Sequence, residues 1–586
     1  MKNYAVRERK KENLVEHLLF HRGIESQEDT EKFLNPDYEK HTHDPFLMKN
    51  MEKVVERILR AIQNNERIAI FSDYDADGIP GAVVLHDFFK KIGYVNFENY
   101  IPDRHGEGFG LNNGAIEELA KRGARLLITI DCGITDAEEV AHANELGLEV
   151  IITDHHLLGE SVPPAFAILN PKQSDCHYPE KMLCGSGVVF KLVQALVKKL
   201  SLSPSTSLGA TRLSSGWEKW LLDMVGIATL SDMVPLTGEN RVFAHFGLKV
   251  LRRSPRIGLG QLLQELRINR GDLTEDDIGF MITPRINAAS RMGVPMDAFR
   301  LLATTDAAEA GTLAKHLNHI NNERKGTVAS LVKEVRKIVA EQHPSTSSGQ
   351  APKVVVAGNP NWRPALLGLV ANTLVADYQK PVFVWGREGG TNLKGSCRSD
   401  GSVDLSLLMQ EARSVFSDFG GHKEAGGFSI VLEKVHLLES ELERAYEKVR
   451  PPANRRAGLS REAEPRYAVD ARISIDEVNS VLWNDIVKLA PFGVGNPKPL
   501  FLFEQVAVGA VELIGKERQH LKLMFVKSTG ERGSAVKFVA KPEDFGGIAH
   551  GQNINLLAHL ENSSFGNRPE LRLRIVDIVA SSATRR

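Results

Sequence analysis

Cysteine is scarce in this chain, and its few positions exclude a disulfide framework. The 586 residues include 4 cysteines, and no two of them have the C-x-x-C spacing of a structural zinc site. Reduced thiols are typical of the cytoplasm, whereas small secreted domains depend on many disulfides. The sequence therefore predicts a cytoplasmic protein.

Long apolar runs are also missing. No uninterrupted stretch of about 18 apolar residues, the length that spans a bilayer, occurs, and the charged amino terminus lacks a signal-peptide core. Hydrophobic residues make up 42% of the chain and charged residues 25%, the balance of a globular protein. We expect neither secretion nor a membrane span.

Neither sign of charge dominates. The 73 Lys and Arg against 74 Asp and Glu leave a net charge of -1, which excludes bulk positive charge as the means of holding nucleic acid. Any nucleic-acid site is therefore expected to be local. The length predicts about three to five domains.

Strand and helix patterns alternate in the first half of the chain. The apolar runs RIAIFS, RLLITI and LEVIIT end abruptly at acidic residues, and amphipathic helical stretches lie between them. Strands that alternate with helices predict a doubly wound parallel sheet. A new α/β pattern later in the chain predicts a second, smaller α/β domain, and short alternating segments near the end predict a small β-barrel.

Domain boundaries are placed where the composition changes. We expect an amino-terminal helical segment, a first α/β domain, a connecting helix, a second α/β domain, a linker, and a further linker segment with the barrel, over 1–45, 46–300, 301–342, 352–450, 451–465 and 466–586. Two low-complexity stretches that share the letters PSTS, 201–216 and 343–352, are interpreted as exposed insertions or linkers without assigned chemistry.

Acidic residues and two histidines follow three successive strands. They are Asp73, Asp75 and Asp77 after the first strand, Asp131 after the second, and Asp154, His155 and His156 after the third. The carboxyl ends of parallel strands share one edge of a sheet, so we expect these side chains to converge. Carboxylates a few Å apart raise one another's pKa unless cations neutralise them. The sequence therefore predicts a metal site.

Oxygen ligands with one or two imidazoles suit Mn²⁺ or Mg²⁺ better than structural zinc. Two such ions roughly 3.5 to 4 Å apart can stabilise the attacking and leaving oxygens of a phosphoryl transfer, so metal-dependent phosphoester hydrolysis is the expected reaction class. A single Asp after a strand is more often a turn former or helix N-cap. The first three acids alone also resemble a calcium loop, although the glutamate expected at the twelfth loop position is missing.

Other segments indicate contacts with phosphate or DNA. Arg285, Asn287 and Arg291 in PRINAASRMG can clamp a phosphate, unless they are solvated residues at a helix start. The glycines of GGHKEAGG let backbone amides approach an anion. The barrel region mixes cations with rings, which suits a single strand held by charge and stacking, or else a solvated face above an aromatic core. Its residues are Lys516, Arg518, His520, Lys522, Phe525, Phe565, Arg568, Arg572 and Arg574.

The strings DYDADG, DCG, DHH and SDMVPL, in this order, resemble the four motifs of the DHH phosphoesterase superfamily. The strings IPDRHGEGFGLN, CGSGVVFKLVQAL, PRINAASRMG and APFGVGNPKPLF extend the match from about residue 46 to the carboxyl terminus. With them the chain is similar to the RecJ family of single-strand-specific 5′-to-3′ exodeoxyribonucleases.

The resemblance implies roles for individual residues. One metal is then held by Asp73, Asp75 and Asp131, and a second by Asp77, Asp131, His155 and Asp232. Asp131 bridges both ions and is catalytic, His156 contacts the phosphate or the nucleophilic water, and Asp154 orients the histidines. From the residues alone, Asp232 could equally be an ordinary turn residue after a helix. The resemblance also implies substrate contacts in the second domain from Arg398, Ser399, Gly421 and His422.

The expected fold is α/β: a doubly wound parallel-sheet DHH domain, a second smaller α/β DHH-associated domain and a C-terminal OB-type β-barrel. The expected function is 5′-to-3′ exonuclease action on single-stranded DNA, releasing mononucleotides in recombination and repair, with two divalent cations, Mn²⁺ or Mg²⁺. We expect a monomer, with a single-strand-binding protein and a helicase as further partners. The alternatives are another DHH-family phosphodiesterase acting on short RNA or cyclic dinucleotides, and a non-catalytic relative that grips DNA.

Overall fold

The computed structural model describes residues 4–159, 161–202, 213–214, 216–342, 352–387, 392–450, 467–515, 517–563 and 570–580. They form two compact units. The larger unit comprises His43–Asp232 and Phe246–Ser460, and the smaller unit Met1–Thr42, Met233–His245 and Arg461–Arg586. The PSTS letters of both low-complexity stretches and the linker expected over 451–465 lie outside the described residues.

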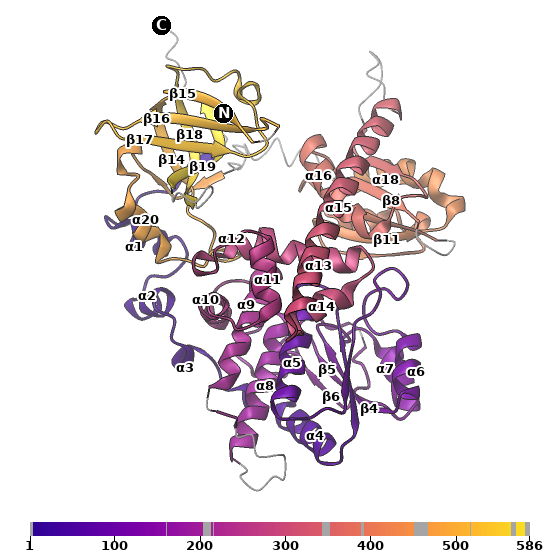
Figure 1. Cartoon of the computed structure of the whole chain (residues 1–586). Helices are drawn as coiled ribbons and strands as arrows, with labels where there is room; N and C mark the ends of the chain where they lie inside the picture. Colours follow the sequence, from indigo (N-terminus) through magenta and orange to yellow (C-terminus); the bar gives the residue numbers. More distant parts are fainter. Residues whose placement is uncertain are drawn as a thin grey trace. The chain divides into compact units, whose positions relative to one another are not determined.

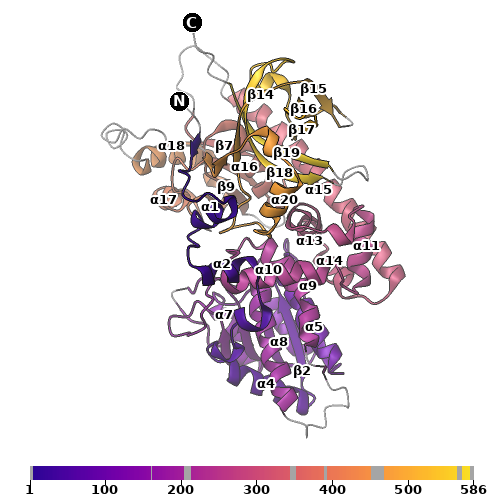
Figure 2. The same cartoon turned by 90° about the vertical axis from the view of Figure 1, so that its left-hand side faces the viewer.

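A five-stranded parallel sheet forms the first α/β domain of the larger unit. Its order is β3-β2-β4-β5-β6, with bounds β2 Arg67–Ser72, β3 Phe97–Tyr100, β4 Ala124–Ile130, β5 Glu149–Thr153 and β6 Ala167–Leu169. One face is covered by α6 (Asn113–Lys121) and α7 (Ala137–Glu145), and the other by α4 (Met51–Gln63), α5 (Gly78–Lys91) and α8 (Gly185–Leu202), as Figures 1 and 2 show. The expected doubly wound sheet is confirmed.

The central strands are apolar along almost their whole length because both faces of the sheet are covered. Every residue from Ile68 to Phe71 and from Leu126 to Ile128 is 0% exposed. Close packing of this kind makes the interior stiff. The carboxyl ends of these strands are therefore held in place, and so are the residues that directly follow them.

Helices complete the first domain and lead into the second. Their bounds are η1 Pro45–Leu47, η2 Trp217–Leu221, α9 Leu222–Ser231, α11 Ile257–Glu265, η3 Arg270–Asp272, α12 Glu275–Asp277, the π-helix η4 Ile278–Ile282, α13 Thr283–Arg291, α14 Pro295–Ala303 and α15 Ala307–Gln342. A further helix, α10, spans Gly238–Leu251.

The second α/β domain is built on a five-stranded mixed sheet of order β10-β11-β9-β8-β7. Its strands are β7 Val355–Gly358, β8 Val382–Gly386, β9 Leu393–Arg398, β10 Asp418–Gly421 and β11 Ala425–Ile430. One face packs against α16 (Pro364–Tyr378) and the carboxyl half of α15, and the other against α17 (Leu405–Glu411) and α18 (Leu438–Val449). The smaller α/β domain expected from the sequence is confirmed.

The smaller unit contains a seven-stranded sheet of order β13-β14-β18-β19-β17-β16-β15 around an apolar core, in agreement with the expected OB-type barrel. The strands are β13 Ala471–Arg472, β14 Phe501–Ala507, β15 Ala510–Ile514, β16 His520–Val526, β17 Arg532–Lys537, β18 Asn553–Ser563 and β19 Glu570–Ala580. Helix α20 (Ser480–Val487) precedes the main strands.

The amino-terminal segment is part of the same unit as the barrel. Strand β1 (Tyr4–Val6) pairs in parallel with β12 (Tyr467–Val469), and helices α1 (Leu14–Phe20), α2 (Gln27–Leu34) and α3 (Tyr38–His41) follow it. The first two of these helices can be followed in Figure 2. The buried His17 donates from Nε2 to Asp470 O at 2.8 Å. The segment therefore contains a strand in addition to the expected helices.

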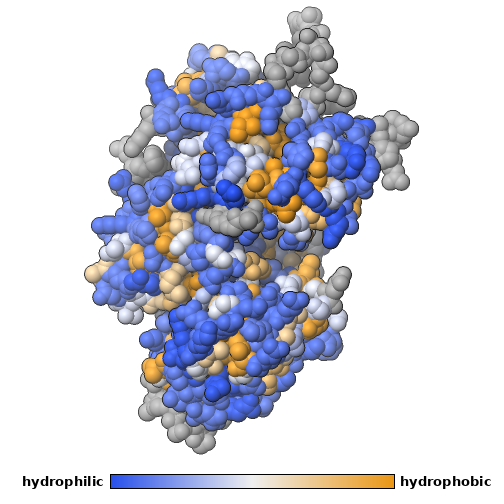
Figure 3. Space-filling model, turned by 90° about the vertical axis from the view of Figure 1, so that its right-hand side faces the viewer, coloured by the Kyte–Doolittle hydropathy of each residue, from blue (hydrophilic) through white to orange (hydrophobic). Residues whose placement is uncertain are grey.

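No helix of the described residues combines the length and apolar character needed to cross a membrane. The face of the protein drawn in Figure 3 is mostly hydrophilic, and its apolar residues lie in small separate groups.

Arg256 is expected to stabilise the larger unit. Its guanidinium lies 2.7 Å from Asp87 Oδ2 and 2.8 Å from Asp223 Oδ2, and the Asp223 side chain is 1% exposed. Arg256→Leu leaves the Asp223 carboxylate buried without its cation, so the unfolding free energy should fall by about 3 kcal/mol in chemical denaturation. Arg300→Leu, which breaks an exposed pair with Glu309, is the control and should cost under about 1 kcal/mol. Equal losses in both variants would contradict the prediction.

Candidate active site

Three aspartates extend the ladder of the parallel sheet by one residue beyond the strand ends. Each donates its backbone N–H to the neighbouring strand: Asp73 to Ile130 O at 3.0 Å, Asp131 to Thr153 O at 2.9 Å and Asp154 to Leu169 O at 3.0 Å. Residues from three distant stretches of sequence therefore lie side by side at the carboxyl edge of the sheet.

Asp131 occupies a strained and crowded position. Its φ of 63° lies in the left-handed region, which is unusual for a residue other than glycine. The residue opposite is Gly185, where a Cβ would lie 2.6 Å from Asp131 Oδ1. Strained backbone held in place by its surroundings is common at functional sites.

Asp77 is fixed by the start of α8. Its two carboxylate oxygens accept the N–H groups of Gly185 and Ser186 at 2.6 and 2.7 Å, and the Ser186 hydroxyl donates to the Asp77 carbonyl. Asp75 Oδ1 accepts the N–H groups of Asp77 and Gly78. The acidic loop after β2 is thereby anchored at both carboxylates.

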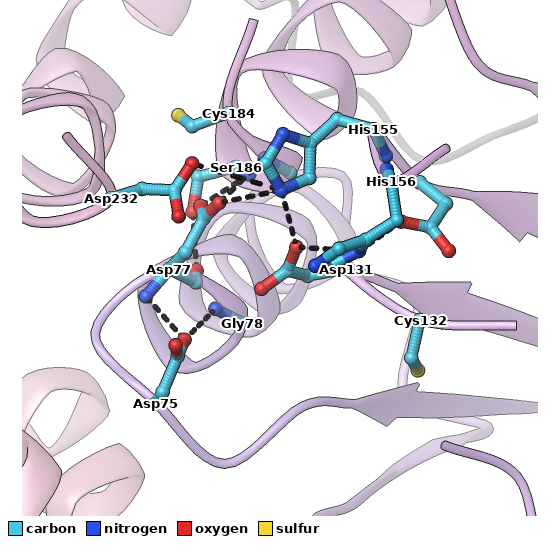
Figure 4. Close-up of polar contacts among 12 residues, drawn as sticks. Asp75, Asp77, Gly78, Asp131, Cys132, His155, His156, Cys184, Ser186 and Asp232 are labelled. Carbon is cyan, nitrogen blue, oxygen red and sulfur yellow. Dashed lines mark hydrogen bonds and ion pairs between the residues drawn. The ribbon is translucent and has the colours of Figure 1, made fainter. Parts of the chain in front are cut away.

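The side chains expected to bind metal form groups whose ligand atoms lie within 4.8 Å of one another. These groups are Asp73, Asp75 and Asp131; Asp77, His155 and Asp232; and Asp131, His155 and His156. Figure 4 shows Asp77, Asp131 and Asp232 pointing toward His155. His155 Nε2 lies 3.1 Å from Asp131 Oδ1, 3.7 Å from Asp232 Oδ2 and 3.8 Å from Asp77 Oδ2.

Three buried atoms of this centre have no hydrogen-bond partner among the described residues: Asp73 Oδ1, Asp131 Oδ1 and His155 Nε2. Although the last two are 3.1 Å apart, their geometry does not form a hydrogen bond. An unpaired buried polar atom costs about 1–3 kcal/mol. Carboxylate oxygens and an imidazole nitrogen directed at one region fit a divalent cation such as Mn²⁺ or Mg²⁺.

Burial and mutual repulsion favour the protonated forms of the carboxyl groups. Burial, followed by the charge of a neighbouring aspartate, raises the pKa of Asp73, Asp75 and Asp131. The same causes raise the pKa of Asp232 to about 8. Burial lowers the pKa of His155, which keeps the imidazole neutral, the form that ligates metals.

His156 has the opposite character. Burial alone would lower its pKa, but its bond from Nδ1 to Asp154 Oδ1 at 2.8 Å and the charge of Asp154 raise it. Asp154 also accepts the N–H groups of both histidines and of Ile134, so it orients the whole turn. Its own pKa is lowered, because these hydrogen bonds outweigh burial. These contacts favour the cationic form of the imidazole, and in that form it suits a phosphate contact or a proton donor.

The three residues of the expected phosphate clamp, Arg285, Asn287 and Arg291, lie on α13. Each of them forms a hydrogen bond with a residue outside this helix. Arg285 donates to Asn318 Oδ1 and Met281 O, and Arg291 donates to Ala365 O at 2.6 Å. Asn287 Oδ1 accepts the Ala76 N–H at 2.9 Å. Both arginines retain further N–H donors beyond these bonds.

The expected substrate residues of the second domain lie at the ends of two strands. Arg398 is partly buried and donates to Cys397 O, and Ser399 donates to Val403 O. Gly421 has a φ of 150° and no room for a Cβ, which would lie 2.5 Å from Ala425 O. His422 is exposed beside it.

Three further cationic side chains near the arginines of α13 were not identified from the sequence. Arg104 lies 4.9 Å from the Tyr74 ring centre, and Arg324 and Lys325 lie on α15. Burial and then neighbouring guanidiniums lower the pKa of Lys325 and bring that of Arg291 to about 10. The cation-rich strings IPDRHG and NNERKG were the available signal.

A pocket of about 400 Å³ within the larger unit is lined by both of its domains. The first domain contributes Tyr74, Arg104 and Phe109, and the second contributes Lys394 and Phe428, among others. The pocket thus combines cationic groups with aromatic side chains, of which Phe109 is exposed, and it includes Tyr74 of the acidic loop.

The barrel residues divide into core and surface. Phe525 is 3% exposed and belongs to the apolar core, so its interpretation as a stacking residue is wrong. Phe538, which was not identified, is 43% exposed. His520 packs edge-on against its ring at 5.3 Å, and Arg574 lies 5.7 Å from its centre. Lys516, Phe565 and Arg568 lie outside the described residues.

Three family profiles match the chain. They are the DHH family, N-terminal domain, over residues 67–216, the DHHA1 domain over 351–449 and the RecJ OB domain over 469–577.

Curated relatives and solved structures cover most of the chain. The single-stranded-DNA-specific exonuclease RecJ of Bacillus subtilis is 35% identical over 570 residues, 97% of this chain and 68% of the relative. The protein of the same name from Haemophilus influenzae is 29% identical over 526 residues, 88% of this chain and 87% of the relative. The crystal structure of RecJ in complex with Mn²⁺ from Thermus thermophilus matches with a TM-score of 0.77 and 25% identity, over 99% of this chain and 80% of that one.

The raised pKa of Asp232 predicts a pH dependence of stability. Its pKa rises from 3.8 to about 8 in the folded protein, so the folded state binds this proton more tightly than the unfolded state. In EDTA, this contribution to stability should be present below about pH 4 and fall until about pH 8. The difference in unfolding free energy between wild type and Asp232→Asn, measured across that range, isolates it. A constant difference would contradict the assignment.

Proposed function

Because the chain belongs to the RecJ family, we propose that it is a metal-dependent exonuclease that hydrolyses the phosphodiester bonds of single-stranded DNA. The observation that carries this proposal is the convergence of buried acids and an imidazole at the edge of the parallel sheet. We further propose 5′-to-3′ polarity and mononucleotide products, in recombination and repair.

Two divalent cations, Mn²⁺ or Mg²⁺, are the proposed cofactors. Structures of Thermus thermophilus RecJ contain one or the other. The proposed ligands are Asp73, Asp75 and Asp131 for one ion, and Asp77, Asp131, His155 and Asp232 for the other. When bound, such ions stabilise negative charge on phosphoryl oxygens and activate water at neutral pH.

The chain's own residues then divide the remaining work. In its cationic form, His156 offers an N–H to the phosphate or the attacking water, and Asp154 holds its ring in place. Asp131 belongs to both proposed ligand sets, and its Oδ1 lies 3.1 Å from His155 Nε2. Arg285, Asn287 and Arg291, with Arg398, Ser399, Gly421 and His422, are the proposed substrate contacts, supported by their donors and by the crowded glycine loop.

The wider setting is also proposed. A single-strand-specific nuclease needs exposed strands, so a helicase and a single-strand-binding protein are the proposed partners. Every ligand of the candidate centre comes from one chain, which supports a monomer. All four cysteines are free thiols, which supports a cytoplasmic location.

The proposed domain boundaries are those expected from the sequence, over 46–300, 301–342, 352–450 and 466–586. The ranges of the three family profiles support them. The alternative of a phosphodiesterase for short RNA or cyclic dinucleotides is less well supported, because the RecJ OB domain match and its ring-and-cation surface suit a longer single strand.

Asp131→Ala should abolish Mn²⁺-dependent digestion of 5′-labelled single-stranded DNA, with a loss of at least about 10³-fold in rate. The substitution removes a side chain that belongs to both proposed ligand sets and whose Oδ1 lies 3.1 Å from His155 Nε2. Asp272→Asn, an exposed residue, is the control and should digest DNA normally. In wild type, labelled mononucleotide should appear first; full-length label that shortens gradually would instead indicate the opposite polarity.

Phe538→Ala should weaken binding of a single-stranded oligonucleotide by about 10-fold, because base stacking on an aromatic ring contributes about 1–3 kcal/mol. Fluorescence anisotropy in EDTA measures this affinity without cleavage. Val539→Ala, at a neighbouring residue that is 80% exposed, removes apolar surface without a ring and should have little effect. Equal effects of the two substitutions would rule out stacking.

A further inference from the structure

The short helix α13 makes polar contacts with three separate parts of the larger unit. Its residues reach the acidic loop, the end of α9 and the start of α16: Asn287 Oδ1 accepts the Ala76 N–H at 2.9 Å, the Thr283 and Ser231 hydroxyls lie 2.5 Å apart, and Arg291 Nη1 donates to Ala365 O at 2.6 Å. A nine-residue helix thus connects regions far apart in the sequence.

The contact with the acidic loop lies between two candidate metal ligands. Ala76 separates Asp75 from Asp77 and is 1% exposed. Water cannot readily replace Asn287 as the acceptor of so buried an N–H, and an unsatisfied buried N–H is costly. The path of the loop at this residue therefore depends on the Asn287 side chain.

The conformation of the loop in turn sets the direction of both carboxylates. Asp75 Oδ1 accepts the N–H groups of Asp77 and Gly78, so a shift of the backbone at Ala76 disturbs these bonds. At the other end of α13, Thr283 contacts Ser231, which directly precedes Asp232. The same helix therefore supports residues beside both candidate ligand groups.

We propose that α13 positions the metal-binding loop and that Asn287 is a positioning residue for Asp75 and Asp77. This role rests on the proposed function and, for Asn287 alone, replaces the phosphate contact proposed for the same segment; Arg285 and Arg291 keep that role. The bond from Arg291 to α16 extends the support to the second domain, which carries substrate residues. The metal ligands and the substrate domain thus share one support.

Mn²⁺ binding to the full chain without DNA tests the proposal, followed by the electron paramagnetic resonance signal of free Mn²⁺. Asn287→Ala should weaken Mn²⁺ affinity by about 10-fold, the effect typical of residues that orient metal ligands. Asn287→Asp should stay within about 3-fold of wild type, because its carboxylate still accepts the Ala76 N–H. Asn287→Leu, with nearly the original shape, is measured alongside and should behave like Asn287→Ala.

DNA affinity in EDTA distinguishes positioning from direct phosphate contact. A positioning residue leaves the affinity for a 5′-phosphorylated oligonucleotide within about 2-fold in Asn287→Ala, and raising Mn²⁺ restores much of kcat. Unchanged Mn²⁺ affinity in both Asn287→Ala and Asn287→Leu would overturn the proposal. If wild type itself bound no Mn²⁺, the proposed function would fail instead.

Discussion

Electrostatic repulsion among buried carboxylates is the main constraint that the structure of the larger unit has to satisfy. Asp73, Asp131 and Asp232 lie in one centre where burial and neighbouring charge all favour protonation. A protein gains nothing in stability from such an arrangement by itself. It is maintained by a sheet whose central strands β2, β4 and β5 are buried along almost their whole length, and close packing of this kind holds their ends in place.

The surroundings of the acids show how the chain meets this constraint. The first amides of α8 bind Asp77, where the partial positive charge of a helix start stabilises an anion. Gly185, at the same turn, leaves the room that Asp131 requires. One turn therefore stabilises one carboxylate by charge and accommodates another by its lack of a side chain.

Much of this centre could be predicted from the sequence because its pattern is local. An apolar run that stops at an aspartate indicates a strand end, and parallel strands bring their ends together. Asp232 follows a helix, so local pattern left it undecided, and only the resemblance favoured a ligand. The contact of His17 with Asp470 joins residues 453 positions apart and has no local signal.

The barrel shows a different limit on what can be predicted from the sequence. Leu521, Leu523 and Phe525 alternate in phase along β16, so the period of two already indicated that Phe525 faces the core. Phe538 lies just beyond the end of β17, where that period no longer applies. An exposed ring at such a position is recognised as a candidate for stacking only when neighbouring strands bring His520 and Arg574 beside it.

The arginines of the larger unit, like its acids, are clustered with groups of the same charge. Arg285 is buried, and Arg291 and Arg324 are partly buried. Burial lowers the pKa of each, and the charge of Arg324 adds to the effect on the other two. Each cluster is costly alone, because like charges share a region of low dielectric. The proposed divalent cations would neutralise the acids, and the phosphates of the proposed substrate would neutralise the arginines. A chain with a net charge of -1 thereby acquires affinity for a polyanion through the separation of its charges rather than their sum.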